Sequence, residues 1–241
     1  IAGTMLSWQA TNFLDGATHA DWTPTWCQDN SGSLQIPESE CDVLLDLYLA
    51  TDGDNWYNSI NNNNKWFQWD GSNICWSNWY GISGCERSMI DGKYHIQSIN
   101  LDNNNLSWTL AASIYTLPNL SQLYIKDNPN LDVDIDDLTQ SIYASNYTAI
   151  NISNNIIYGD ITQFSNLSNL EYLDVGCYWN APAGNCRATG DTSFVPSLPN
   201  LYAIKVGYNT GFTFDLSDLS GRTNIREIFA LETYIVGDMD V

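Results

Sequence analysis

Apolar residues recur in short segments along the second half of the chain. Six segments match the pattern L-x-x-L-x-L-x-x-N-x-L, starting at residues 96, 120, 147, 170, 201 and 225, so the spacings are 24, 27, 23, 31 and 24 residues. The fourth and sixth positions are apolar in every copy: Ile99/Leu101, Leu123/Ile125, Ile150/Ile152, Leu173/Val175, Ile204/Val206 and Ile228/Ala230. Side chains alternate between the faces of a strand, so these positions point inward and the fifth points outward. The pattern predicts one short strand per copy, stacked into one parallel sheet.

An asparagine follows the strand in four of the six copies. It occupies the ninth position as Asn104, Asn128, Asn155 and Asn209. We expect it where the chain turns away from the strand, because an amide there can satisfy backbone groups that the bend leaves unpaired. The four residues then form a ladder along the stack.

Several copies continue with a second apolar motif that contains glycine. It reads "IYGDI" at 157–161 and "IVGDM" at 235–239, and "LSWTL" at 106–110 and "LDVDI" at 131–135 lack the glycine. These features resemble the leucine-rich repeat family, in particular its plant-type L-x-G-x-I subclass. The resemblance implies an α/β repeat solenoid, a right-handed coil with a parallel concave β-sheet, short second strands and 3₁₀ or helical convex segments. The sixth copy stops in mid-repeat at Val241, which predicts that the native chain continues.

The region upstream of the repeats is similar to the N-terminal cap of the same subclass. It contains "CDVLLDLYLATDGDNW" at 41–56 and "KWFQWDGSNICWSNWYGISGC" at 65–85. Val43, Leu44, Leu47 and Tyr48 are spaced as one helix face, and the turn at 52–55 ends that helix. We expect five tryptophans to fill the cover over the first coil: Trp56, Trp66, Trp69, Trp76 and Trp79. We divide the chain into an unassigned Trp-containing N-terminal segment, 1–37, which we expect to pack on the cap or extend it, a capping region, 38–95, and six repeats, 96–241, the last incomplete.

The charge balance excludes two classes of partner. Asp and Glu number 28 against 8 Lys and Arg, which gives a formal net charge of −20. Such a surface repels phosphate backbones and anionic membranes, so we expect no nucleic-acid partner. No run of about 18 apolar residues is present, so we expect no membrane span within this segment.

Cysteines and glycosylation sequons point to an extracellular protein, either secreted or on the cell surface. The six cysteines form three pairs of short separation, Cys27 with Cys41, Cys75 with Cys85, and Cys177 with Cys186, which predicts three disulfides. Five N-x-S/T sequons begin at Asn105, Asn119, Asn146, Asn151 and Asn166.

We expect neither an enzyme nor a cofactor or metal site. His19 and His95 are the only histidines, and no recognisable nucleophile motif lies beside either. The "TDGDN" turn at 51–55 lacks the twelfth-position glutamate of a calcium loop, so we interpret it as a helix-ending turn. "DVDIDD" at 132–137 is interpreted as a solvated convex face.

Two surfaces are candidates for ligand contact. One is the outward, concave face of the predicted sheet, where aromatic rings mix with amides and charges. Its candidate residues are Tyr124, Lys126, Asn151, Tyr172, Asp174, Lys205, Tyr208 and Phe229. The other is the loop closed by Cys177 and Cys186, which carries Tyr178 and Trp179.

Two functions follow from these surfaces. The first is an extracellular recognition module that binds a protein, peptide or glycan, as the resemblance to receptor-like and adhesion ectodomains implies. The second is a structural subunit of a matrix, wall or filament, which self-assembles through repeat contacts and the N-terminal Trp8, Trp22 and Trp26. A glycan at Asn151 would cover part of the concave face.

Overall fold

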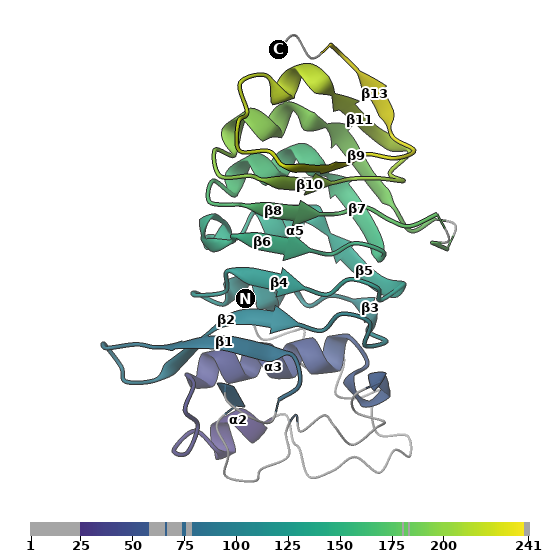
Figure 1. Ribbon diagram of the computed structural model, residues 1–241. Helices are drawn as coiled ribbons and strands as arrows, with labels where there is room; N and C mark the ends of the chain where they lie inside the picture. Colours follow the sequence, from purple (N-terminus) through teal and green to yellow (C-terminus); the bar gives the residue numbers. More distant parts are fainter. Residues whose placement is uncertain are drawn as a thin grey trace.

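The computed structural model describes residues 25–57, 66, 74–75, 79–179, 181–182 and 184–238. The repeats form a coil in which nearly every turn contributes a strand to each of two sheets (Figure 1). We call the first the concave sheet. Its strands, in spatial order, are β1 (Ile82–Arg87), β2 (Tyr94–Asn100), β4 (Gln122–Tyr124), β6 (Ala149–Asn151), β8 (Tyr172–Asp174), β10 (Ala203–Lys205) and β12 (Glu227–Phe229). β1 pairs antiparallel with β2, and the remaining pairs are parallel, as the repeat pattern predicts.

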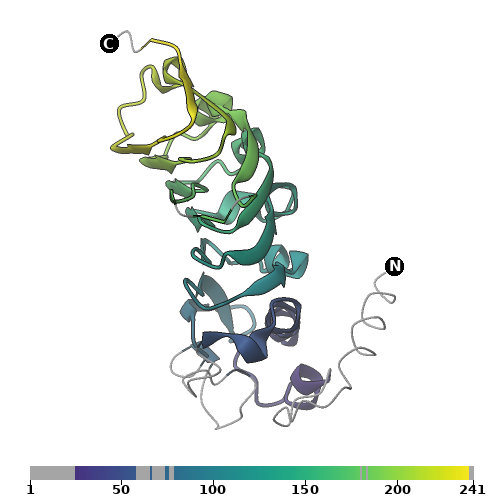
Figure 2. The ribbon, with the colours of Figure 1, turned by 90° about the vertical axis from the view of Figure 1, so that its right-hand side faces the viewer.

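The second sheet, which we call the lateral sheet, is formed by the glycine-containing motif. Its strands are β3 (Ser107–Thr109), β5 (Asn130–Asp134), β7 (Ile156–Asp160), β9 (Arg187–Asp191), β11 (Gly211–Asp215) and β13 (Tyr234–Val236). Short helical segments return the chain: η3 (Ala112–Thr116), α5 (Ile135–Thr139), η4 (Ala144–Asn146), η5 (Ile161–Asn166), η6 (Thr192–Ser197) and η7 (Leu216–Leu219). They lie on the convex side, opposite the concave sheet (Figure 2).

The core runs through the coil between the two sheets and the helical segments. The fourth and sixth positions of the first five repeats are completely buried, which confirms that prediction. The sixth repeat differs, because Ile228 is 44% exposed. It lies in the last described coil, whereas each inner coil is covered by the next one.

The asparagine ladder satisfies the backbone as predicted. Asn128 accepts hydrogen bonds at Oδ1 from the backbone N–H groups of Asn104 (3.0 Å) and Leu106 (2.9 Å). Its Nδ2 donates to the carbonyl oxygens of Leu101 (3.0 Å) and Ile125 (2.7 Å). Nδ2 also contacts the carbonyl oxygen of Lys126 (3.2 Å), so one buried amide holds five backbone groups of two successive coils.

Aspartates start the helical segments on the convex side. Asp134, Asp160, Asp191 and Asp215 each precede a segment, and each side chain accepts a hydrogen bond from the N–H two residues further on. This bond satisfies a backbone donor that the start of a helical turn leaves unpaired. These four aspartates thus stabilise the starts of the helical segments.

The cap consists of α2 (Trp26–Asp29), α3 (Glu38–Ala50), η1 (Gly53–Asn55) and the β1–β2 hairpin. The predicted face of α3 is confirmed, since Val43, Leu44, Leu47 and Tyr48 are all buried. Tryptophans 26, 56, 66 and 79 are also buried and contact one another or Tyr48. Trp8, Trp22, Trp69 and Trp76 lie outside the described residues. Cys27 and Cys41 join α2 to α3, while the division at residues 37/38 and 95/96 stays a prediction.

A buried carboxylate attaches α3 to the first repeat. Glu40 accepts the N–H of Ile96 at Oε2 (2.9 Å), and its Oε1 lies 2.5 Å from Nδ1 of His95. Burial raises the pKa of Glu40, partly offset by these two contacts. His95 therefore has a structural partner in the cap. In the described part of the chain, no helix is long and apolar enough to cross a membrane.

Candidate functional site

The outward residues of the concave sheet form one row across the strands. Strand register places Tyr124 beside Asn151, Asn151 beside Asp174, Asp174 beside Lys205, and Lys205 beside Phe229. Neighbouring strands lie about 4.8 Å apart, so side chains in this row contact one another directly. The structure therefore brings together the column that the sequence pattern predicts.

Four polar or charged side chains of β8, β10 and β12 lie close together on the concave sheet. Nζ of Lys205 lies 2.7 Å from Oε1 of Glu227 and 5.3 Å from the centre of the Tyr172 ring. The Tyr172 hydroxyl lies 3.4 Å from Oδ2 of Asp174, whose Oδ1 accepts the N–H of Gly176 (3.2 Å). We call Tyr172, Asp174, Lys205 and Glu227 the charged cluster. Glu227 was not among the predicted site residues.

Burial changes the protonation of this cluster. It raises the pKa of Asp174 to about 6, against the opposing effects of the Gly176 N–H and the Lys205 ammonium. It also raises the pKa of Tyr172 to about 12, with the Asp174 charge acting in the same direction. The pKa of Lys205 is raised because Glu227 and Tyr172 outweigh partial burial. The Lys205 ammonium thus keeps its charge beside the buried carboxyl group of Asp174.

Aromatic rings border the charged cluster. Tyr172 lies 6.3 Å from Tyr202, and Tyr208 lies 6.4 Å from Phe229, measured between ring centres. Tyr202 and Phe229 are 39% and 37% exposed. Rings held this way offer apolar area with little loss of side-chain freedom on binding, which suits contact with another molecule.

The remaining concave-face candidates are held by local contacts. Nζ of Lys126 lies 4.0 Å from Oδ2 of Asp127, and Tyr124 is partly buried. Asn151 is only 7% exposed, and its Oδ1 accepts hydrogen bonds from the hydroxyl and the N–H of Ser153 (2.7 and 3.2 Å). Asn151 therefore shapes the surface and contributes little exposed area to it.

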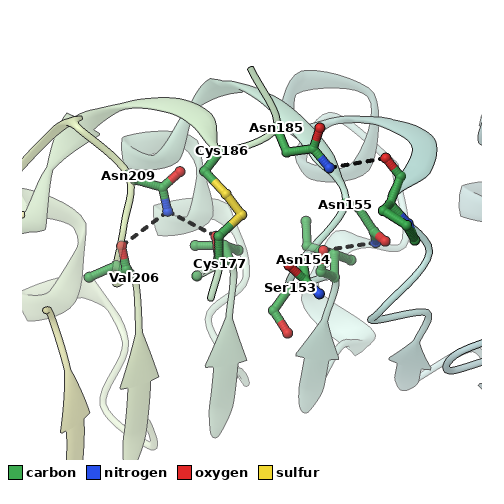
Figure 3. The surroundings of a disulfide bond; sticks show 12 residues. Ser153, Asn154, Asn155, Cys177, Asn185, Cys186, Val206 and Asn209 are labelled. Carbon is green, nitrogen blue, oxygen red and sulfur yellow. Dashed lines mark hydrogen bonds between the residues drawn. A yellow bond between two sulfur atoms is a disulfide. The ribbon is translucent and has the colours of Figure 1, made fainter. Parts of the chain in front are cut away.

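The predicted loop leaves the concave sheet just beyond the charged cluster. Cys177 directly follows Gly176, and its disulfide with Cys186 closes the loop (Figure 3). Tyr178 and Trp179 are 42% and 82% exposed. The loop takes the place of a ladder asparagine, and Asn185 from within it donates to the carbonyl oxygen of Pro129 (3.0 Å).

The loop also interrupts the ladder. Asn209 donates to the carbonyl oxygens of Val175 (2.9 Å) and Val206 (3.0 Å), as Figure 3 shows. Its Oδ1 is buried and has no hydrogen-bond partner among the described residues. In the regular ladder this oxygen accepts backbone N–H groups of the preceding coil, which here carries the inserted loop.

All three predicted disulfides are present, and the sequons occupy different environments. Cys75–Cys85 lies within the cap and ties Cys75 to β1, in addition to the two pairs above. Asn105 and Asn146 donate their amides to the carbonyl oxygens of Asn55 (2.8 Å) and Pro118 (2.6 Å). Asn166 is exposed on the convex side and makes a longer contact with the carbonyl oxygen of Thr139 (3.5 Å). Asn119 is partly buried. Glycosylation of these sites and of Asn151 stays a prediction.

The acidic segments that resemble cation loops already have local partners. Both carboxylate oxygens of Asp52 accept Nδ2 of Asn55 (3.0 Å), and Asp54 accepts the hydroxyl of Tyr48 (2.8 Å). In the second segment, Asp134 accepts the N–H of Asp136 (2.9 Å). Within the described ranges, no group of three or more His, Cys, Asp or Glu is arranged to hold a metal ion.

Comparison with known proteins identifies the fold. No family model matches the sequence, and no curated protein matches it. The ectodomain of the receptor kinase SOBIR1 from Arabidopsis thaliana is similar in structure, with a TM-score of 0.63 and 20% identity over 85% of this chain and 98% of that one. A plant ice-binding protein has a TM-score of 0.61 and 16% identity, over 83% of this chain and 58% of the other.

A third similar structure is a complex. It contains the Arabidopsis receptor kinase HAESA with the peptide hormone IDA and the co-receptor SERK1. The TM-score is 0.53 at 16% identity, over 80% of this chain and 33% of HAESA. This chain thus spans about the length of the SOBIR1 ectodomain but a smaller part of the other two proteins. The chain has two parallel-stranded sheets along one coil, a buried asparagine ladder and a disulfide-linked cap. Together with these structural likenesses, they show that the chain has the plant-type leucine-rich repeat fold.

Proposed function

We propose that this chain is an extracellular recognition module that binds a peptide, or an extended segment of a protein, across the C-terminal half of its concave sheet. The observation that carries this proposal is the charged cluster on β8, β10 and β12, bordered by Tyr202, Tyr208 and Phe229. Aromatic anchors beside fixed charges are typical of the centre of binding surfaces.

Peptide ligands suit this surface because it is shallow and long. An extended peptide lying across parallel strands meets a new side chain about every 4.8 Å, with polar or charged residues between aromatic ones in this row. The rings supply apolar contact, and the pair Lys205–Glu227 and the carboxylate of Asp174 supply hydrogen bonds. The presence of a peptide hormone in the HAESA complex supports this choice of ligand class.

The ligand is expected to be basic. The chain carries a formal charge of −20, and Lys205, the ammonium in the charged cluster, is already paired with Glu227. Complementary charge steers a basic ligand toward such a surface. The three disulfides support an oxidising location, as expected for an ectodomain or a secreted protein.

Selection from a random peptide library on the immobilised chain tests the proposal. Selected peptides are titrated against the parent and the Tyr124→Ala, Tyr172→Ala and Lys205→Ala variants, with Asn166→Ala on the convex side as the matched control. We expect Tyr172→Ala and Lys205→Ala to weaken binding by about tenfold or more. Asn166→Ala should leave the affinity unchanged, and all four variants should keep the parent melting temperature within a few degrees.

Two results would contradict the proposal. If no peptide is selected reproducibly, or if every selected peptide binds the concave-face variants as tightly as the parent, the concave sheet is not the binding surface. The alternative of a structural subunit also involves Trp8 and Trp22, which lie outside the described residues, so it stays a prediction.

A further inference from the structure

The tip of the β1–β2 hairpin carries two adjacent apolar side chains that face solvent. Met89 is 97% exposed and Ile90 is 98% exposed, which are the highest values for large apolar side chains in the described part of the chain. The hairpin itself projects sideways beyond the stacked coils (Figure 1). A single exposed apolar residue is ordinary, but two neighbours at a projecting tip can pack on an apolar surface of another molecule.

Hydrogen bonds around Ser88 hold the turn at this tip. The N–H of Ser88 donates to the carbonyl oxygen of Lys93 (2.8 Å), and its own carbonyl oxygen accepts the N–H of Gly92 (3.1 Å). The hydroxyl oxygen accepts the N–H of Ile90 (3.1 Å), and Nε of Arg87 donates to the carbonyl oxygen of Gly92 (3.1 Å). A turn that is ordered in advance loses little conformational freedom on binding, so the apolar pair is presented in a form suited to contact.

The base of the hairpin is fixed to the cap and to the repeats. The N–H of Tyr94 donates to the carbonyl oxygen of Gln35 (2.8 Å). Nζ of Lys93 donates to the carbonyl oxygen of Ile36 (3.4 Å). On its other side, β2 pairs with β4 as the first parallel pair of the concave sheet. The tip therefore keeps a fixed position relative to that sheet.

The tip is locally basic on an acidic chain. In residues 87–93, "RSMIDGK", Arg87 and Lys93 against Asp91 give a formal charge of +1, on a chain whose total is −20. The carboxylate of Asp91 already has partners, since Oδ1 accepts the N–H of Lys93 (3.0 Å) and Oδ2 lies 3.2 Å from Nε2 of His95. An apolar and basic segment is the class of ligand proposed above for the concave sheet.

We propose that the hairpin tip of one copy of this chain binds the C-terminal half of the concave sheet of a second copy, an inference that rests on the proposed binding surface. Met89 and Ile90 pack on the aromatic rings that border the charged cluster, and Arg87 approaches its carboxylates. The charges are complementary, because the cluster contains Asp174 and Glu227. Contact through a projecting tip also keeps the remaining acidic surfaces of the two copies apart, which limits their repulsion.

Sedimentation velocity of the full chain, at concentrations up to about 1 mM, tests for this self-association. Ile90→Asp places a carboxylate at the tip. Ile142→Asp, between α5 and η4, is the matched control, since Ile142 is 86% exposed and the substitution adds the same charge. We expect the parent to self-associate and Ile90→Asp to weaken the association by about tenfold or more. Ile142→Asp should associate like the parent, and both variants should keep the parent melting temperature because both side chains are exposed.

Mixing two variants identifies the surface that receives the tip. Tyr172→Ala alters the concave sheet and should weaken self-association, as Ile90→Asp does. Because Ile90→Asp keeps an intact concave sheet and Tyr172→Ala keeps an intact tip, an equimolar mixture should associate more tightly than either variant alone. If two tips bind each other instead, Tyr172→Ala associates like the parent, which overturns the proposal.

Three other results also overturn it: a parent that is monomeric at every concentration, an Ile90→Asp variant that associates like the parent, or a mixture that associates no better than its components. Peptide titrations keep this inference separate from the proposed function. If selected peptides bind Tyr172→Ala more weakly than the parent while the parent stays monomeric, only the second copy is wrong as the ligand. If Tyr172→Ala changes neither peptide binding nor self-association, the concave surface is wrong as well.

Discussion

At the scale of single residues, buried amides connect the coils. Asn128 holds five backbone groups with both ends of its side chain, whereas the interrupted ladder leaves Asn209 with two donated bonds and an Oδ1 without a partner among the described residues. Both are completely buried. The two residues have the same chemistry and burial but different numbers of partners, so comparing them measures the contribution of the oxygen.

Asn128→Ala should destabilise the fold more than Asn209→Ala. The first leaves two N–H groups and the Leu101 carbonyl oxygen without this partner, while Asn155 still donates to Ile125, and we expect a cost of about 3 kcal/mol. The second leaves only two carbonyl oxygens and removes an unsatisfied acceptor, so we expect a loss of about 1 kcal/mol. Urea unfolding followed by circular dichroism measures both. Equal losses of stability would show that the hydrogen bonds accepted by Oδ1 of Asn128 do not stabilise the ladder.

Asp174 should make the fold less stable as the pH rises. Its pKa is about 6 in the folded chain because of burial, against 3.8 for the ordinary carboxyl group. The folded state therefore holds the proton more tightly, and the stability from Asp174 is fully present below about pH 4 and lost as the pH rises through 6. Asp174→Asn should be more stable than the parent at pH 7, by no more than about 3 kcal/mol, and equal to it at about pH 4.

Asp215→Asn is the control with the opposite sign. Hydrogen bonds from the hydroxyl and N–H of Ser217 lower the pKa of Asp215, so its contribution is present at neutral pH and lost in acid. This variant should be less stable than the parent at neutral pH, and the difference should vanish as the pH falls. The same sign of effect for Asp174→Asn and Asp215→Asn would show that burial does not control the protonation of Asp174.

At the scale of elements, the cap depends on one buried carboxylate. Glu40 connects α3 to β2 through Ile96 and His95 and is itself 2% exposed. It is covered on one side by the helix and on the other by the β1–β2 hairpin, which closes the first coil of the solenoid. An open end of the coil exposes apolar sheet, so a cap that detaches would expose the first core layer to water.

Glu40→Ala should loosen the cap. It leaves the Ile96 N–H without its acceptor and Nδ1 of His95 without Glu40, although Nε2 of His95 still contacts Asp91, and we expect a cost of about 3 kcal/mol. Glu38, in the same helical turn, is exposed, so Glu38→Ala should change stability by no more than about 0.5 kcal/mol. Hydrogen exchange of the α3 amides, measured with the unfolding midpoint, detects local opening. Equal effects of the two variants would show that Glu40 does not connect the cap to the repeats.

The repeat pattern predicts these elements well because each strand follows a local rule. Alternation places Ile150 and Ile152 in the core and Tyr124 outside, and the helical spacing of Leu44 and Leu47 gives α3. The partner of Lys205 could not be found in this way, since Glu227 lies in a column two positions earlier on the next strand. The sequence signal for Glu227 was the shared register of adjacent repeats, which brings side chains from different columns of neighbouring strands close together.

Trp108 shows a second limit of pattern reading. The motif "LSWTL" shows that glycine is missing, but a missing glycine predicts a buried side chain, as for Val133 and Phe214. The backbone of Trp108 instead has a positive φ, as at the glycine positions, and the residue is 54% exposed. The sequence alone does not distinguish these two outcomes, because they depend on packing between the first coil and its neighbours.

At the scale of the whole molecule, charge dominates long-range behaviour. A formal charge of −20 on 241 residues produces an attractive field for cations at distances beyond direct contact. Salt screens this field, since the screening length falls from about 30 Å at 0.01 M to about 3 Å at 1 M. The field affects how fast a ligand arrives more than how long it stays.

Binding of a basic peptide selected on this chain should therefore be sensitive to salt. We expect its association rate constant to fall by about tenfold or more as ionic strength rises from about 0.01 M to about 1 M, with little change in the dissociation rate. Surface plasmon resonance measures both rates. The control is the same peptide with its Lys and Arg replaced by Gln. An association rate that is independent of salt would show that the acidic surface plays no part in recognition.

The most direct test of binding on the concave face is a map of protected backbone amides in the bound state. Hydrogen exchange is measured by mass spectrometry with and without a selected peptide. Binding there predicts slower exchange at the carboxyl ends of β8 and β10, including the amides of Gly176, Cys177 and Tyr208. Exchange in η5 on the convex side should not change. Protection confined to the lateral sheet or to the convex segments, with none at β8 and β10, would contradict binding on the concave face.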